Sequence, residues 1–294
     1  MGEKKMRERL GKGDQVALTA CSDLLPRTAE PRIRELCGCL EELGLEPAAG
    51  GYLFGKEPLE RSGREKAETL NGYYRDRKIR AVFDVSGGNA ANEVLPWLDF
   101  EAVKRDPKPF WGYSDCTVLL NAVYTGTGTP GVLWQVRNLV GDAAGLQRER
   151  FGQWLEGGEA LFSPHWKFFS GRSMEGILVG GNIRCFLKLA GTVYFPDLEG
   201  KILFLESLGG GPALLASLLA QLEQLGAFQK IAGLLLGTFT ELEKDPGGTD
   251  ILDLVYRRRI PPDLPVAVTG EIGHGGASRA LLIGGRYEVK EGAV

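Results

Sequence analysis

The first half of the chain alternates short apolar runs with longer amphipathic segments, and this alternation constrains the fold more than any other feature. The apolar runs are predicted to be buried strands, at residues 16–20, 79–85, 108–113 and 131–136. The segments between them are predicted to be helices, at residues 30–44, 58–76 and 115–124. A repeated strand–helix order predicts a parallel sheet with helices on its faces. In such sheets, functional sites lie at the carboxyl ends of the strands.

Strands dominate the second half of the chain, which is predicted to form a β-rich α+β unit. They are expected at residues 174–181, 201–207, 231–239, 264–270 and 280–289. Helices are expected at residues 182–191, 212–226 and 249–259, the last capped by Thr249. Residues 141–170 are less regular and indicate a connector. A chain of 294 residues is long enough for two domains. We therefore expect an N-terminal α/β domain over residues 1–160 and a C-terminal domain over residues 161–294.

Charge and composition argue against several classes of protein. The net charge is −3 and charges of both signs are interspersed, which argues against nucleic acid as a partner. The five cysteines are odd in number and include no C-x-x-C pair, so we expect no disulfide framework and a reducing compartment. The N-terminal residues lack the apolar core of a signal peptide, and no apolar run approaches ~18 residues. These features predict a cytoplasmic protein that neither binds nucleic acid nor spans a membrane.

Nucleotide and metal motifs are absent or stand in the wrong context. No P-loop occurs, and "GTGTPG" at residues 126–131 has the G-x-G-x-x-G spacing of a dinucleotide-binding loop. This segment follows a predicted helix and precedes a predicted strand, which is the reverse of the dinucleotide-binding order. The two histidines, His165 and His274, are too far apart for a zinc-binding H-E-x-x-H motif. We therefore expect no cofactor and no metal site.

The scarcity of histidine narrows the search for an acid–base residue, because histidine most often does this work near pH 7. His165 lies in the connector and is interpreted as incidental. His274 lies in a glycine-rich loop after the predicted strand 264–270. From its position alone, His274 is either a catalytic base or an ordinary loop residue. Glu206, at the carboxyl end of the predicted strand 201–207, is either the strand's exit to solvent or a partner for His274.

Ser114 lies between a predicted strand and a predicted helix and has two interpretations. It can cap the helix, since serine is common at helix starts. It can also be a nucleophile, which needs a base, a group that orients the base and donors for the oxyanion. In that second case the amide of Asp115 would lie near the positive end of the helix. Gly87 and Gly88, after the neighbouring strand, would let further backbone N–H groups approach a substrate.

Taken together, these segments resemble the LD-carboxypeptidase family of serine peptidases, which includes microcin C self-immunity hydrolases. The similarity covers nearly the whole chain, through "LGKGDQVALTA", "SGGNAANEVLPWLDF", "FWGYSDCTVLLNAVY", "KILFLES" and "GEIGHGGASRALLIGG". The family uses a Ser-Glu-His triad, which the matching motifs carry over to Ser114 in "GYSD", Glu206 in "LFLE" and His274 in "GH". Its oxyanion donors carry over to the backbone amides of Asp115 and Gly88. The α/β-hydrolases are a poorer match, because "GYSDC" lacks the second glycine of G-x-S-x-G.

The resemblance also implies how the parts are arranged and what they bind. It implies a flavodoxin- or Rossmann-like N-terminal domain that carries the serine, a β-rich C-terminal domain that carries the glutamate and histidine, and a site between them in a homodimer. It further implies a small peptide or aminoacyl-nucleotide substrate, which we expect Gly87 and Asn89 to contact.

Departures from the family pattern leave the substrate open. Ser86 stands where muropeptide-cleaving members usually have arginine, and "GGNAANEVLP" is closer to the microcin-immunity branch. One candidate bond is the L,D-amide before the terminal D-Ala of a muropeptide. The other is the amide of an aminoacyl or peptidyl nucleotide conjugate. A protein of the same fold that binds such a molecule without cleaving it is the alternative from another class.

Overall fold

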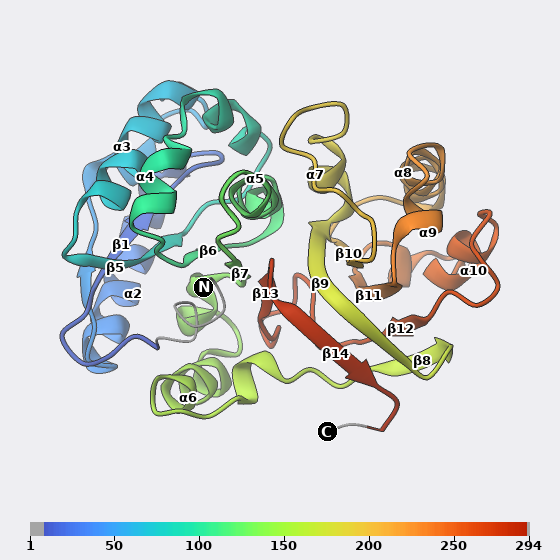
Figure 1. Cartoon of the computed structure of the whole chain (residues 1–294). Helices are drawn as coiled ribbons and strands as arrows, with labels where there is room; N and C mark the ends of the chain where they lie inside the picture. The colour runs from blue at the N-terminus through green and yellow to red at the C-terminus, as the bar shows by residue number, and fades with distance from the viewer. Residues whose placement is uncertain (1–8, 293–294) are drawn as a thin grey trace.

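The computed structural model describes residues 9–292 and contains two six-stranded sheets that lie beside each other (Figure 1). The first sheet has the spatial order β3 (Glu46–Ala48), β1 (Gln15–Thr19), β5 (Ile79–Asp84), β6 (Phe110–Gly112), β7 (Gly131–Leu133) and β13 (Leu281–Ile283). Its strands pair in parallel except for β13, which is antiparallel to β7. The parallel strands, counted along the chain, have the 2-1-3-4-5 order of flavodoxin-like folds. The predicted α/β class is confirmed.

Helices cover both faces of this sheet. They are α2 (Glu30–Glu42), α3 (Gly63–Arg75), α4 (Phe100–Arg105), α5 (Thr117–Thr127) and α6 (Ala144–Leu155). Residues of α2 and α6 share one hydrophobic core with the sheet, and residues of α3, α4 and α5 share another. Helix α3 begins at Gly63 rather than at residue 58, because Ser62 and Glu65 form a reciprocal capping box there.

Helix α6 corrects the prediction that residues 141–170 are only a connector. Its sequence "AGLQRERFGQWL" has too few apolar residues for a clear helical period. The helix is stabilised instead by tertiary packing, since Phe151 and Trp154 are buried against Trp111 of β6. The predicted strand 131–136 is also shorter than expected, because a 3-10 helix begins at Val136.

The second sheet has the order β14 (Arg286–Lys290), β9 (Ser173–Asn182), β10 (Ile202–Ser207), β11 (Gly233–Phe239), β12 (Val266–Val268) and β8 (Lys167–Ser170). The four central strands are parallel and the two edge strands are antiparallel to their neighbours. Its helices are α7 (Ile183–Leu187), α8 (Pro212–Gln224), α9 (Ala227–Lys230) and α10 (Ile251–Tyr256). Helix α10 is capped by Asp250, whose side chain accepts from the Leu252 amide, and not by Thr249 as predicted. A small third sheet pairs β2 (Leu25–Pro26) with β4 (Phe54–Gly55).

The two large sheets share a hydrophobic core. Helix α5, which packs on the first sheet, contributes side chains to it, and so do β9, β10 and β11 of the second sheet. Beside this core, polar contacts join the end of β9 to α5. The Asn121 side chain bonds both the N–H and the C=O of Gly180, and Thr117 Oγ1 accepts from the Asn182 amide. Gly181 next to it has φ 133°, and a Cβ there would lie 2.6 Å from Thr117 Oγ1. The close approach of the two halves therefore requires glycine at this position.

The predicted strand 280–289 is two strands that belong to different sheets. A turn at Gly284 and Gly285 separates β13, which pairs with β7, from β14, which pairs with β9. The chain therefore crosses back to the first sheet near its C-terminus. A division near residue 160 remains a proposal for where the two domains separate. Among residues 9–292, none of the helices combines the length and hydrophobicity that crossing a bilayer demands.

Candidate active site

Ser114 starts a 3-10 helix, Ser114–Cys116, between β6 and α5 and has a strained backbone. Its φ is 55°, the one positive value at a non-glycine position among residues 9–292. A serine in this left-handed conformation costs about 1–3 kcal/mol, and such strain is concentrated at functional sites. The side chain caps neither helix, since the N-cap positions are occupied by Tyr113 and Cys116. The capping interpretation of Ser114 is therefore wrong.

Replacing Ser114 by glycine should make the protein more stable than the Ser114→Ala variant by about 0.5–1 kcal/mol. Glycine adopts positive φ without a steric penalty, whereas alanine keeps the Cβ that causes it. Urea unfolding of both variants measures the difference. Equal unfolding free energies would contradict backbone strain at this position.

The carboxylate of Asp115 anchors the turn that presents Ser114. It is fully buried and accepts hydrogen bonds from Ser22 Oγ (2.7 Å) and the Ala91 amide (2.8 Å), and it pairs with Lys188. Burial alone would raise the pKa of Asp115, but the hydrogen bonds from Lys188, Ser22 and Ala91 outweigh it and lower the pKa. The residue thus stays ionised and holds the turn to three other parts of the chain.

Glu206 and His274 form a hydrogen-bonded pair across the second sheet. Glu206 lies near the end of β10 and is fully buried, and its Oε2 is 2.8 Å from His274 Nδ1. Its other oxygen accepts from Asn182 Nδ2 at 3.0 Å. Both carboxylate oxygens therefore have partners, which a buried charge requires. The interpretation of Glu206 as a strand exit to solvent is wrong.

The far nitrogen of the imidazole is left available. His274 Nε2 is buried and has no hydrogen-bond partner among the described residues. The ring of Tyr113 packs edge-on against the imidazole, with 5.0 Å between ring centroids. Burial, followed by the negative charge of Glu206, raises the pKa of Tyr113, so this phenol stays neutral. The arrangement fixes the imidazole plane and leaves Nε2 free to take a proton.

Ser114 and His274 line the same cavity of about 460 Å³ between the two halves of the molecule. Ser86, Gly87 and Gly88 line it from the end of β5. A cavity of about 590 Å³ elsewhere is lined by aromatic residues around Trp111, but no serine or histidine of the described chain reaches it. Of the two histidines, therefore, only His274 reaches a cavity together with Ser114. His165 is largely exposed and pairs with Glu271.

Gly88 and its neighbours form a loop whose peptide directions are set by Asp23. The Asp23 amide donates to the Gly87 carbonyl at 3.3 Å, and the Asp23 carboxylate accepts from the Asn89 amide at 3.0 Å. Because the peptide between Gly87 and Gly88 is trans, the Gly88 N–H points away from Asp23. Gly88 has φ 135°, and a Cβ there would lie 2.1 Å from the Asp23 carboxylate carbon. Asn89 does not line the cavity, since its amide oxygen accepts from Arg184.

Several residues around the cavity escaped the sequence analysis. Asn182, Arg137 and Arg32 are the main ones; the first contacts Glu206 and the other two line the cavity. Arg137 lies in the 3-10 helix Val136–Val140 and directly follows the predicted strand 131–136, and a charged residue after a parallel strand was an available signal. In residues 9–292, no group of three or more His, Cys, Asp or Glu side chains is arranged to hold a metal ion.

Comparisons with known proteins assign the chain to a family. The N-terminal domain model of the LD-carboxypeptidases matches residues 16–133, and the C-terminal domain model matches residues 175–289. A probable murein peptide carboxypeptidase of Bacillus subtilis is 30% identical over 78% of this chain and 73% of its own length. A putative carboxypeptidase of Vibrio cholerae is 26% identical over 86% and 85%. The solved structure of the microcin C7 self-immunity protein MccF with aspartyl sulfamoyl adenosine has a TM-score of 0.86 at 21% identity, over 96% of this chain and 94% of that one.

The fold and these relatives define a carboxypeptidase-type hydrolase built from two sheets. The chain belongs to the LD-carboxypeptidase family. The family resemblance drawn from the sequence motifs is confirmed.

Proposed function

We propose that the protein is a serine carboxypeptidase of the LD type in which Ser114 is the nucleophile, His274 the general base and Glu206 the residue that orients it. One observation carries the proposal. A buried Glu–His pair leaves a free imidazole nitrogen at a cavity that the strained Ser114 also lines. In proteins without bound substrate the serine–histidine contact is often long and tightens only in the substrate complex, so this role does not require a short Ser114–His274 hydrogen bond in the free protein.

The reaction follows from these roles. Ser114 Oγ attacks the carbonyl carbon of the scissile amide while His274 Nε2 takes its proton. The backbone N–H groups of Asp115 and Gly88 bind the oxyanion, and each such donor contributes about 2.7–4 kcal/mol to transition-state stabilisation. His274 then gives the proton to the leaving amine, and the acyl-enzyme is hydrolysed by a water that His274 activates. Glu206 holds Nδ1–H and stabilises the imidazolium.

The charge of the cavity supports a substrate with a free carboxylate next to the scissile amide. Arg32 and Arg137 line the cavity, whereas no aspartate or glutamate is among the described residues that line it. Arg137 Nε is buried and has no hydrogen-bond partner within residues 9–292. Burial lowers the pKa of Arg137, while the nearby charge of Asp84 opposes this shift. A substrate carboxylate would supply the missing acceptor, because guanidinium groups bind carboxylates in a bidentate manner.

Replacing Arg137 by glutamine should raise KM about 10- to 100-fold for a peptide with a free C-terminal carboxylate and change kcat much less. The cation contributes to binding in the ground state and the transition state alike. Steady-state kinetics on the free peptide and on its C-terminal amide measure the effect. The amide should be a poor substrate of both enzymes, with no further loss in the variant. An equal loss on both substrates would contradict carboxylate binding by Arg137.

Two substrates fit this chemistry, and the leading one is the L,D-amide before the terminal D-Ala of a muropeptide. The murein peptide carboxypeptidase among the relatives favours it. The second candidate is an aminoacyl or peptidyl nucleotide conjugate of the microcin type, in which the scissile bond is also an amide. The MccF structure with aspartyl sulfamoyl adenosine and the Ser86 departure favour this alternative.

Mass spectrometry of products from both substrates decides between them. We expect wild type to release D-Ala from a muropeptide tetrapeptide and to leave an aminoacyl sulfamoyl adenosine intact, with Ser114→Ala as the blank. The reverse preference would assign the chain to the nucleotide-conjugate branch. Binding of either compound without turnover by wild type would support a non-catalytic binding protein.

The family resemblance also supports a homodimer, with Gly87 contacting the substrate beside Gly88. The odd number of cysteines without a C-x-x-C pair supports a cytoplasmic location. Sedimentation velocity tests the dimer, and cell fractionation tests the location. A monomer at all concentrations would contradict the first part of this proposal.

A further inference from the structure

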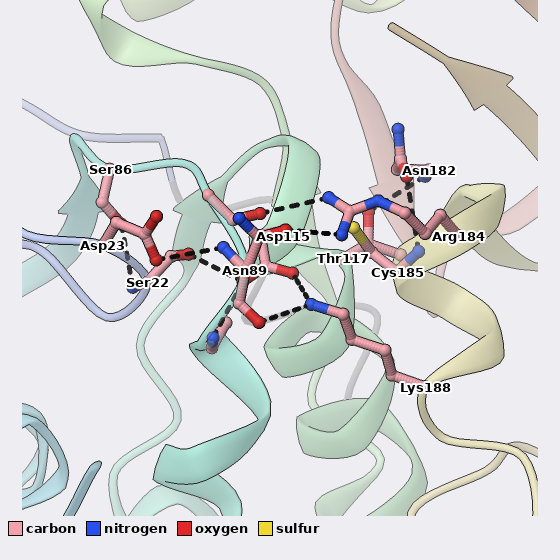
Figure 2. A network of polar contacts seen from close by, with 12 residues as sticks. Ser22, Asp23, Ser86, Asn89, Asp115, Thr117, Asn182, Arg184, Cys185 and Lys188 are labelled. Carbon is pink, nitrogen blue, oxygen red and sulfur yellow. Dashed lines mark hydrogen bonds and ion pairs between the residues drawn. The ribbon is translucent and has the colours of Figure 1, made fainter. Parts of the chain in front are cut away.

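A short segment of the second half reaches three parts of the proposed site. Asn182 caps α7 and bonds Glu206, and the cations Arg184 and Lys188 follow it in the same segment. Arg184 lies in α7 and Lys188 is the C-cap residue of this helix, with helical backbone angles. Because the two are four residues apart, their side chains lie on the same face. Figure 2 shows both side chains reaching from α7 to the loop of Asn89 and to Asp115.

Lys188 contacts both segments of the first half that supply the proposed hydrogen-bond donors to the oxyanion. Its Nζ pairs with Asp115 Oδ1 and donates to the Asn89 carbonyl at 2.7 Å (Figure 2). The Lys188 side chain is 19% exposed and the Asp115 side chain is 0% exposed. A pair so shielded from water is little screened by salt.

Arg184 contacts the segment of Gly88 and Asn89. Its Nη1 donates to Asn89 Oδ1 at 2.7 Å and its Nη2 donates to the Gly88 carbonyl at 3.1 Å. The Asp23 carboxylate holds the Asn89 amide from the other side. The peptide after Gly88 is therefore fixed at both its C=O and its N–H. The Asp23 amide holds the preceding peptide through the Gly87 carbonyl. Together these restraints limit the torsions of Gly88, whose backbone is otherwise the most permissive, and help to fix where its N–H points.

Neither cation lines the cavity, so neither is placed to touch a substrate. Their contacts cross from the second sheet's helix to loops that follow β5 and β6 of the first sheet. The separation between the amides of Gly88 and Asp115 is thus restrained from the second half as well as by Ser22, Asp23 and Ala91 of the first half. Oxyanion donors must keep this separation closely, since a misplacement of about 1 Å can cost about 100-fold in rate.

We propose that Arg184 and Lys188, the α7 clamp, are positioning residues that hold the backbone amides of Gly88 and Asp115 at the spacing the oxyanion requires. The α7 clamp rests on the proposed function, because it acts through the donors of that mechanism. It makes the docking of the two halves a condition for catalysis: the donors are aligned only when α7 lies against both loops.

Replacing Lys188 by methionine should lower kcat about 100-fold and change KM less than about threefold. Methionine keeps the length and the apolar stem but removes the charge and both contacts. The Arg184→Leu variant should act in the same direction, and Lys188→Arg should recover part of the rate. Lys230→Met, which removes an exposed lysine of α9, is the matched control and should leave kcat unchanged.

Two further measurements separate positioning from loss of stability. Hydrogen exchange at residues 86–91 and 113–116 should be faster in Lys188→Met than in wild type, with unchanged exchange in β10 and β11. Substrate affinity in the Ser114→Ala background should be the same with and without Lys188→Met. In a double-mutant cycle, Asp115→Asn should add little to Lys188→Met, since both act through one contact.

The outcomes distinguish the α7 clamp from the proposed function. A normal kcat in Lys188→Met, or a change in KM alone, would overturn the α7 clamp. The proposed function would still be supported in that case, provided that wild type turns over a substrate. If wild type hydrolyses neither substrate, the function fails by itself and hydrogen exchange decides the clamp. Unchanged exchange at residues 86–91 and 113–116 overturns it in that case.

Discussion

The Ser114→Ala variant should lose about a millionfold in kcat while its folded structure is retained. The nucleophilic oxygen is removed, and only the oxyanion donors and substrate binding remain to accelerate the reaction. Alanine has the same Cβ as serine, so the strained turn is unchanged, and no cap is lost because the Ser114 side chain caps neither helix. Product release followed by mass spectrometry measures kcat, and thermal unfolding checks the fold.

The matched control for this prediction is Ser173→Ala, which changes an exposed serine at the start of β9. It should keep full activity. His274→Ala should cost about as much as Ser114→Ala, and the double variant should cost no more than either, because the two groups act as a unit. His165→Ala, which breaks the surface Glu–His pair, should have no effect. Turnover that persists in Ser114→Ala, or losses that multiply in the double variant, would exclude the serine mechanism.

Replacing Glu206 by glutamine should lower kcat about 10⁴-fold with a smaller change in KM. Asn182 Nδ2 donates to one oxygen of Glu206, which directs the oxygen of a glutamine toward Asn182 and its NH₂ toward His274. The imidazole nitrogen facing that NH₂ must then be the acceptor. The proton moves to Nε2, which can no longer take a proton from Ser114.

The structure also allows this tautomer argument to be tested directly. Nitrogen NMR of labelled histidine should show the Nδ1–H form in wild type and the Nε2–H form in Glu206→Gln. In the double variant Glu206→Gln/Asn182→Asp, the carboxylate at position 182 can accept a hydrogen bond from the glutamine NH₂. The glutamine can then turn its oxygen toward His274. We expect this variant to recover part of the rate. A Glu206→Gln enzyme with a near-normal kcat would show that Glu206 is not needed to orient His274.

Local sequence signals were sufficient for the elements that follow a simple period. Strands β1, β5 and β10 are mainly apolar runs, and the order of strands and helices in the first half predicts its parallel sheet. The parallel pairing of β9, β10, β11 and β12 in the second sheet was not predicted. Helix α6 could not be predicted in this way, because its stability comes from two aromatic side chains that pack on Trp111. The segment 280–289 has one apolar pattern, but its two strands pair with β7 and β9, which are far apart along the chain.

The residues of the candidate site likewise divide into those with a local sequence signal and those without one. Ser114, Glu206 and His274 each stand at the end of a strand or in a loop that follows one, which is a local property that motif matching can detect. Arg184 and Lys188 carry no such signal, since cations on a short helix are ordinary surface residues until a partner is known. Their contacts with Asn89 and Asp115 span large separations in the sequence.

The sequence by itself determined the class of fold, because that depends on apolar residues at short, regular spacings, and it determined the family through its motifs. The residues proposed to do the chemistry follow from that family resemblance, since their positions alone left other interpretations open. Only the tertiary structure decided that Ser114 is strained rather than a cap, that Glu206 is buried against His274 and that α7 joins the two halves. These properties depend on which distant segments meet. Burial, backbone strain and cross-sheet hydrogen bonds exist only after the two sheets have packed on their common core.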